Sequence, residues 1–320
     1  MNRTQQILTG VLIVQIILAV VTLWPEPPKE PGVALLGGIT ADQITSFSVA
    51  DNTGSVVTLE RSGDTWVISG TDDFPANSET VTKVLEDLVL VKTGRTVATS
   101  PDSFARLQVA DDDFLRRIWI KDDQGKEYTL YLGSTVGTSA THVRLSGSNE
   151  TLLTDKVTTY DFGNSVRNWI NSTYVEVPRA QMTKMTLQNS SGTYEFTNEG
   201  TSEEENWVMA GLKSGEVFNP NNMVSMLTRL TNLQMTVPLG KTEKPEYGMD
   251  EPSAIVTLDY TDDAGNAQQL VLTVGALDET DGTYYVHASS SEYYVKIPSY
   301  VMTDFVERSK EIFLKADAAK

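Results

Sequence analysis

The sequence predicts an α+β fold, built as two tandem duplicated domains behind an N-terminal transmembrane helix. Three observations lead there: short alternating strands bounded by turn residues, one amphipathic helix in each half, and a pattern that recurs about 140 residues later. Each domain is expected to be mainly antiparallel β-sheet with one packed helix and a helical C-terminal tail. We expect an anchor at residues 1–24, a proline-rich stalk at 25–38, a first domain at 39–177 and a second at 178–320.

The predicted membrane segment is residues 7–24, which contain no charged side chain. A helix of this length spans about 27 Å, close to the thickness of the hydrocarbon core. Arg3 precedes the segment and favours a cytoplasmic N-terminus, so the domains are expected on the extracytoplasmic side of the cell membrane. A cleaved signal peptide is the main alternative. The length of the apolar run and the lack of a small-x-small cleavage site before Pro25 argue against it. A soluble core helix is the third reading.

Four prolines at positions 25–31 follow the anchor and favour extended polyproline geometry. We expect a stalk of roughly 20 Å between the membrane and the first domain.

Each predicted domain opens with three short strands joined by turns. The third strand carries a tryptophan, Trp66 in the first domain and Trp207 in the second. A core anchor is the simplest role for both, and a sugar-stacking platform is the alternative. A helix follows, capped by Asn77 or by Asn219, with apolar residues at identical spacing. Those stripes are Val81, Val84, Leu85, Leu88 and Val91 in the first domain, and Met223, Met226, Leu227, Leu230 and Leu233 in the second.

Later segments also correspond. Residues 122–125 and 262–265 both read Asp-Asp-x-Gly and predict tight hairpin turns. The strands after these turns stop at Gly133 and Gly275. Helical tails are expected at the end of each domain, in which residues 161–170 correspond to residues 304–313.

The pattern resembles the bacterial family called domain of unknown function 4340. The resemblance lies in the N-terminal anchor, the hairpin ending at Trp, the helix and a YGL-D-x-P-like turn, here residues 247–252 (YGMDEP). In the first domain, residues 107–112 (LQVADD) lack the Gly and Pro of that turn. The resemblance implies an accessory role at the cell envelope, since members are often associated with export-type ABC transporters, and it implies no catalytic residues.

Composition narrows the classes of function. A net charge of −18 repels phosphate backbones, so we expect no nucleic-acid partner. The chain has no cysteine, which excludes disulfides, thiolate metal sites and thiol nucleophiles.

We find no motif for catalysis, metal or cofactor binding, so we expect no enzyme and no cofactor. His142 and His287 have no second histidine at metal spacing, and we expect each to be a solvated or hydrogen-bonded strand residue. Adjacent acids at 111–113 and 203–205 point to opposite sides of an extended strand, and the segment from 259 to 270 has Leu where a calcium loop needs Glu. Solvated loops are the preferred reading. A carboxylate pair for glycoside cleavage stays open, although nothing singles one out.

Two tyrosine pairs, at 284–285 and 293–294, fall on neighbouring strands of the second domain. In each strand one ring should face the core and the other the solvent. We therefore predict a partner-binding surface at Tyr285 and Tyr294.

The sequence leads to one main hypothesis about function. We predict a non-enzymatic, single-pass membrane-anchored accessory protein that holds or recognises a protein partner in an envelope transport complex. The alternative is an extracytoplasmic binding module for a glycan, peptide or small solute, and a hydrolase without sequence motifs is third.

Overall fold

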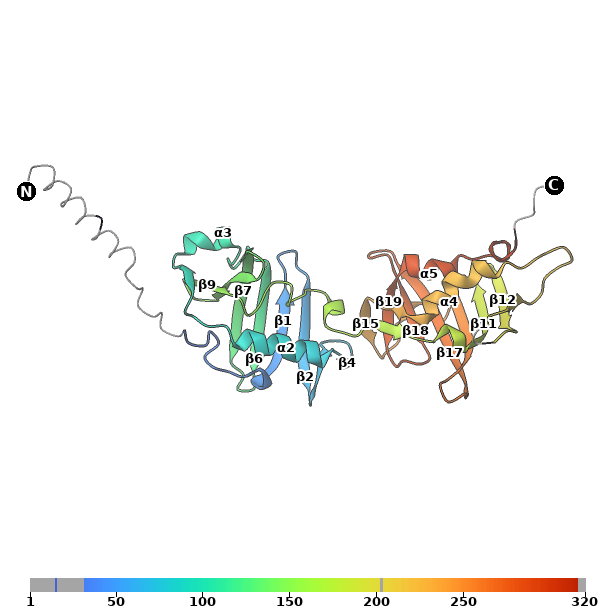
Figure 1. The fold of residues 1–320 in the computed structure, drawn as a ribbon, viewed down its shortest axis with the longest axis horizontal. Coiled ribbons are helices and arrows are strands. Elements are labelled where there is room, and N and C mark those ends of the chain that lie inside the picture. The colour runs from blue at the N-terminus through green and yellow to red at the C-terminus, as the bar shows by residue number, and fades with distance from the viewer. Residues whose placement is uncertain (1–14, 16–31, 202–203, 316–320) are drawn as a thin grey trace, which may run out of the picture.

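Two antiparallel sheets dominate the structure (Figure 1). The structure is a computed structural model, and it describes residues 15, 32–201 and 204–315. The first sheet has nine strands in the order β4-β3-β2-β1-β6-β7-β8-β9-β5, and the second has eight in the order β13-β12-β11-β16-β17-β18-β19-β15. The few helices lie against these sheets. This arrangement confirms the predicted α+β class.

The first sheet contains β1 (Ile44–Ala50), β2 (Val56–Ser62), β3 (Thr65–Ile68), β4 (Phe74–Pro75), β5 (Thr96–Ala98), β6 (Arg116–Asp122), β7 (Glu127–Val136), β8 (Ala140–Leu145) and β9 (Thr151–Thr154). The second contains β11 (Met182–Asn189), β12 (Gly192–Asn198), β13 (Trp207–Met209), β15 (Val237–Gly240), β16 (Ala254–Thr261), β17 (Ala267–Asp278), β18 (Thr283–Ala288) and β19 (Tyr294–Pro298). A separate two-stranded sheet is formed by β10 (Thr173–Val175) and β14 (Leu233–Gln234). The α-helices are α2 (Ser78–Val89), α3 (Phe104–Leu107), α4 (Val224–Thr231) and α5 (Ser299–Val306).

The two predicted amphipathic helices are α2 and α4, and all ten residues of their apolar stripes are at most 9% exposed. The Asn77 side chain caps α2 by accepting a hydrogen bond from the backbone N–H of Thr80 at 3.1 Å. The second helix begins with a 3-10 turn, η5 (Pro220–Met223), which is capped by Asn219 and continues directly into α4. The helices cover their sheets as the spacing predicted.

The two Asp-Asp-x-Gly segments form the predicted hairpin turns, β6 to β7 and β16 to β17. Asp122 Oδ1 accepts hydrogen bonds from the backbone N–H groups of Gln124 and Lys126, at 3.0 and 2.8 Å. Asp262 Oδ1 does the same for Ala264 and Asn266, at 3.0 and 2.8 Å. These acids organise turns, so the segment after residue 259 is a hairpin and not a calcium loop.

Both hairpin tryptophans are core residues. Trp66 is 2% exposed and Trp207 is 5% exposed. The Trp66 ring meets Phe47 edge-on at 5.5 Å between centroids, and Phe47 in turn meets Trp169 at 5.2 Å. Burial confirms the anchoring role and leaves neither ring open to a sugar.

The helical tail predicted for the first domain is wrong at residues 161–170. This segment contains only the 3-10 turn η3 (Val166–Asn168). The Trp169 indole N–H donates to the carbonyl of Gly163 at 2.8 Å, and a Ser165–Asn168 capping box closes the turn. The local hydrogen bonds therefore replace a helix, although Trp169 is still fully buried. The second tail is confirmed in part: residues 304–306 end α5, and the 3-10 helix η7 (Lys310–Phe313) follows after a break.

The first and second sheets meet at one corner of each. The Asp72 carboxylate accepts a hydrogen bond from the backbone N–H of Lys241 at 2.8 Å, and the Tyr293 hydroxyl donates to the carbonyl of Asp73 at 3.1 Å. The rings of Tyr293 and Phe74 lie edge-on, with centroids 4.8 Å apart. The turn before β4 thus rests against the end of β15 and the start of β19.

β10 lies within the range predicted for the first domain, yet it pairs with β14 beside the second sheet. The Tyr174 hydroxyl donates to the carbonyl of Tyr293 at 2.7 Å and accepts from the N–H of Ala288 at 2.9 Å. Burial raises the pKa of Tyr174 to about 12. The connecting segment is therefore docked on the second sheet.

The predicted membrane anchor at residues 7–24 lies outside the described residues except for Gln15, and the prolines at 25–31 lie outside them as well. Within the described ranges, none of the helices has both the length and the apolar character needed to cross a membrane.

Candidate functional site

The structure places Tyr285 and Tyr294 on the face of the second sheet that points away from its main core. In β18 and β19 the core-facing residues are Val286 and Val295, both fully buried. Tyr284 and Tyr293 pack against that core. Tyr285 lies opposite Lys296 in the register of the two strands. That Tyr285 and Tyr294 bind a partner stays a prediction.

A third tyrosine joins the two. Tyr247, the last residue of η6 (Pro245–Tyr247), is 2% exposed, and its ring stacks on Tyr285 with centroids 4.7 Å apart and planes at 25°. It also lies 5.4 Å from the Tyr294 ring, and His287 stacks on Tyr294 at 4.5 Å. We call Tyr247, Tyr285, His287 and Tyr294 the aromatic face. The YGMDEP turn carried this signal, but only its role as a turn was predicted.

Close backbone contact holds η6 on the sheet. A Cβ atom at Gly275 in β17 would lie 2.0 Å from the carbonyl oxygen of Tyr247, so only glycine fits there. Gly248 ends η6 with φ +64°, in the left-handed region that glycine adopts without strain. The strand end at Gly275 and the Tyr-Gly turn are therefore two halves of one contact.

Charged groups border the aromatic face. Lys296 Nζ lies 2.6 Å from a carboxylate oxygen of Asp278 and 2.6 Å from one of Asp281, and it is 5.1 Å from the centre of the Tyr285 ring. The Tyr285 hydroxyl donates to Asp278 at 3.1 Å, and the Tyr294 hydroxyl donates to Glu243 at 2.9 Å. Sequence reasoning missed this network, because its members lie in separate strands and turns.

The network shifts the pKa values of Asp278, Lys296 and Tyr285. Hydrogen bonds from Lys296 and Thr280 hold the pKa of Asp278 well below its usual range. Burial lowers the pKa of Lys296, but its hydrogen bonds to Asp278 and Asp281 outweigh that effect and raise it. Burial raises the pKa of Tyr285, and its hydrogen bond to Asp278 adds to the shift. All these groups therefore keep their ordinary charge at neutral pH.

The corresponding face of the first sheet is closed. There Leu107, Val109, Phe114 and Tyr131 form a small cluster of buried residues. Arg144, whose side chain is 3% exposed, lies over the rings of Phe104 and Tyr131 and donates to the carbonyl of Val109 at 2.6 Å. It also pairs with Asp111, one of the three adjacent acids. The partly exposed tyrosines are thus a feature of the second sheet.

The two histidines lie apart. His142 is buried, and its Nδ1 lies 2.7 Å from the carbonyl oxygen of Ser134. His287 belongs to the aromatic face. Across the described ranges, no three His, Asp or Glu side chains come together in a way that could hold a metal ion.

Comparison with known protein families gives one match. The family model named Domain of unknown function (DUF4340) matches residues 66–252, from β3 of the first sheet to the segment before β16 of the second. Searches of curated proteins and of solved structures found no match. The match covers more than half of the chain and includes the YGMDEP turn.

Proposed function

Because this chain belongs to the family described as Domain of unknown function (DUF4340), whose description names no activity, we propose a function from the geometry of the second sheet. The chain is a non-enzymatic accessory protein, anchored in the cell membrane by residues 7–24, with its sheets outside the cytoplasm. It binds a protein partner of an envelope transport complex, such as an export-type ABC transporter, through the aromatic face. It uses no cofactor and no nucleic acid.

The observation that carries this proposal is the fixed position of Tyr285 and Tyr294. Both rings are partly exposed and contact the buried Tyr247, Tyr285 by stacking and Tyr294 at a tilt of 40°. Their hydroxyls are tethered to Asp278 and Glu243, respectively. Tyrosines held in this way lose little conformational entropy on binding, and tyrosine is enriched at protein interfaces. A rigid, amphipathic patch of this kind suits a protein surface.

The charged network supports a binding role over catalysis. Asp278 and Lys296 are each other's partners, and the pKa of Asp278 lies below its usual range while that of Lys296 lies above. A general acid or base works best with a pKa near the operating pH. Neither group has that property.

Tandem duplication is part of the proposal. Eight strands of each sheet occupy equivalent places in the two strand orders. Gly133 and Gly275 also make the same contact, because a Cβ atom at either position would lie 2.0 Å from a backbone carbonyl oxygen. We infer that the second copy kept partly exposed tyrosines while the first closed the same face with Arg144.

A glycan, peptide or small solute is the alternative ligand. The stacking favours a protein over a sugar, because a neighbouring ring or cation already lies over each tyrosine: Tyr247 and Lys296 over Tyr285, and His287 over Tyr294. A sugar needs an open ring face, whereas a protein can contact ring edges and hydroxyls.

Co-purification from detergent-solubilised membranes tests the proposal. The wild-type chain should recover transporter subunits in stoichiometric amounts, and Tyr285→Ser with Tyr294→Ser should recover at most about a tenth as much, as expected when interface tyrosines are lost. The control is Tyr160→Ser with Tyr300→Ser, since these tyrosines are 89% and 71% exposed and lie elsewhere.

A third variant separates binding from folding. Tyr285→Phe with Tyr294→Phe keeps the stacked rings and should keep the melting temperature near that of wild type. If wild type and every variant were purified without transporter subunits, the proposal would be contradicted. Binding of glycans by that solitary chain would establish the alternative.

A further inference from the structure

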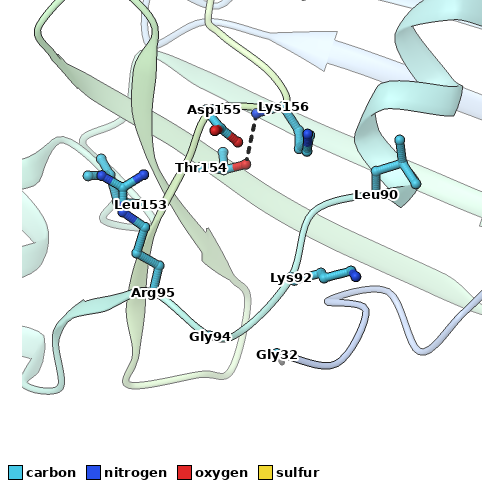
Figure 2. A pocket seen from close by; sticks show the side chains of 9 residues that line it. All are labelled: Gly32, Leu90, Lys92, Gly94, Arg95, Leu153, Thr154, Asp155 and Lys156. Carbon is cyan, nitrogen blue, oxygen red and sulfur yellow. Dashed lines mark hydrogen bonds between the residues drawn. The ribbon is translucent and has the colours of Figure 1, made fainter. Parts of the chain in front are cut away.

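A cleft of about 460 Å³ lies at the edge of the first sheet that is farthest from the second sheet (Figure 2). Its walls come from the segment around Gly32, from residues 90–95 before β5, and from residues 153–156 at the end of β9. Sequence patterns do not reveal this cleft, because its residues come from three separate segments.

Three of the lining side chains are cations: Lys92, Arg95 and Lys156. Asp155 is the one acid among the lining residues, in a protein whose net charge is −18. Within the part of the chain that the structure describes, none of the three cations forms an ion pair. Figure 2 shows Arg95 on one side of the opening, with Lys92 and Lys156 toward the other. Like charges gathered around one cleft favour an anion between them.

Buried neighbours and backbone hydrogen bonds fix the frame of the cleft. Val91 and Val157, next in sequence to Lys92 and Lys156, are 0% and 1% exposed. The N–H of Leu153 donates to the carbonyl of Arg95 at 2.9 Å, which joins the second and third walls.

The first wall is joined to the second in the same way. The N–H of Thr93 donates to the carbonyl of Val33 at 2.9 Å. A Cβ atom on Gly32 would lie 2.2 Å from the backbone nitrogen of Gly94, so the backbones of these two segments are in direct contact. The cations therefore project from a frame that is already in place before any ligand binds.

We propose that this cleft binds the phosphate group of an anionic ligand. Arginine supplies a planar donor pair and lysines supply point charges, which together suit a phosphate. A volume of about 460 Å³ exceeds a bare phosphate and falls within the usual range for small-molecule sites. Leu153 in the wall and Leu90, which is 51% exposed at the rim, offer apolar contacts to the organic part of a phosphate ester.

The phosphate can belong to a soluble ester or to a phospholipid headgroup, and titration calorimetry on the full chain in neutral detergent distinguishes them. The probes are glycerol 3-phosphate and short-chain phosphatidylglycerol, with short-chain phosphatidylcholine as a zwitterionic comparison. Binding of glycerol 3-phosphate assigns a soluble ester. Binding of phosphatidylglycerol alone assigns a lipid headgroup.

The variant Lys92→Gln, Arg95→Gln, Lys156→Gln should weaken binding of the accepted probe by about tenfold or more, since loss of a single charged hydrogen bond has an effect of that size. The charge-matched control is Lys83→Gln, Arg106→Gln, Lys121→Gln, three exposed cations that do not line the cleft. The control should bind like wild type, and added salt should weaken both.

Two results would overturn the proposal. One is that neither anionic probe binds the wild-type chain. The other is that the cleft variant and the control lose affinity equally, which would mean that overall charge and not the cleft attracts the probe. The site does not depend on the aromatic face, because the two lie on different sheets.

Discussion

Gly133 and Gly275 show how a single residue positions a whole segment. Each lets a carbonyl oxygen, of Leu107 or Tyr247, lie where a side chain would otherwise be. The residues that follow those carbonyls adopt left-handed backbone conformations, with φ +56° at Gln108 and +64° at Gly248. The first sheet thus makes the turn without the glycine present in the YGMDEP segment.

Gly275→Ala should destabilise the second sheet by about 2 kcal/mol or more, because the added methyl group must displace the Tyr247 carbonyl. Urea unfolding measures the loss, and near-UV circular dichroism should report a changed tyrosine environment. Gly265→Ala is the control: its Cβ meets no atom within 4 Å, and only its φ of +82° opposes the change. An unaltered tyrosine signal in Gly275→Ala would contradict the contact.

Acid should weaken the Lys296 network. The pKa of Asp278 is lowered from its ordinary 3.8, so its contribution to stability is complete above that value and declines as pH falls below it toward the folded-state pKa. The melting temperature of Asp278→Asn should therefore lie below that of wild type at pH 7, and the gap should narrow by pH 3. A constant gap across this range would show that the charge of Asp278 is not involved.

At the scale of secondary-structure elements, the helices and hairpins were predictable because their signals are local. The stripe of α2 repeats at helical spacing, and Asp122 and Asp262 make their turns with residues two and four positions later. The failed prediction is equally local in cause. Trp169 donates its indole N–H to Gly163, a side-chain to backbone bond that apolar spacing does not reveal.

Asn77→Ala should destabilise the first sheet domain by about 1 kcal/mol, since the first turn of α2 would lose its cap. Asn77→Asp is the matched control, because a carboxylate can accept the same hydrogen bond from Thr80 and favours the helix N-terminus. Chemical denaturation monitored by tryptophan fluorescence measures both. Equal losses in the two variants would show that the cap is not the stabilising contact.

At the scale of the whole molecule, the contact between the sheets lay beyond sequence reasoning. Asp72 and Lys241 are 169 residues apart, and no periodic pattern links them. Asp72 and Asp73 also adopt φ values of +51° and +64°, which are uncommon for residues other than glycine. The same holds for the candidate site: Tyr285 and Tyr294 were predictable from strand alternation, whereas Tyr247 reaches them through tertiary structure.

Tyr293→Ala should loosen the two sheets from each other, because it removes the contact with Phe74 and the hydrogen bond to Asp73. An aromatic pair of this kind contributes about 1 kcal/mol, which lowers the melting temperature of a domain of this size by about 3 °C. Calorimetry should show one transition splitting or broadening. Tyr300→Ala, at an exposed position, should leave the profile unchanged. An unsplit profile at wild-type temperature in Tyr293→Ala would argue against coupling.

The corner at which the turn before β4 meets the end of β15 has a consequence for self-association. Each sheet has two border strands, and one border strand of each, β4 or β15, ends at this corner. In the part of the chain that the structure describes, β5 and β13 are the borders left at the outer ends, with Thr96 and Val97 of β5 open to solvent. Strand-by-strand growth of an aggregate would therefore start at these ends, and a proline or lysine at Val97 is the substitution that should block it.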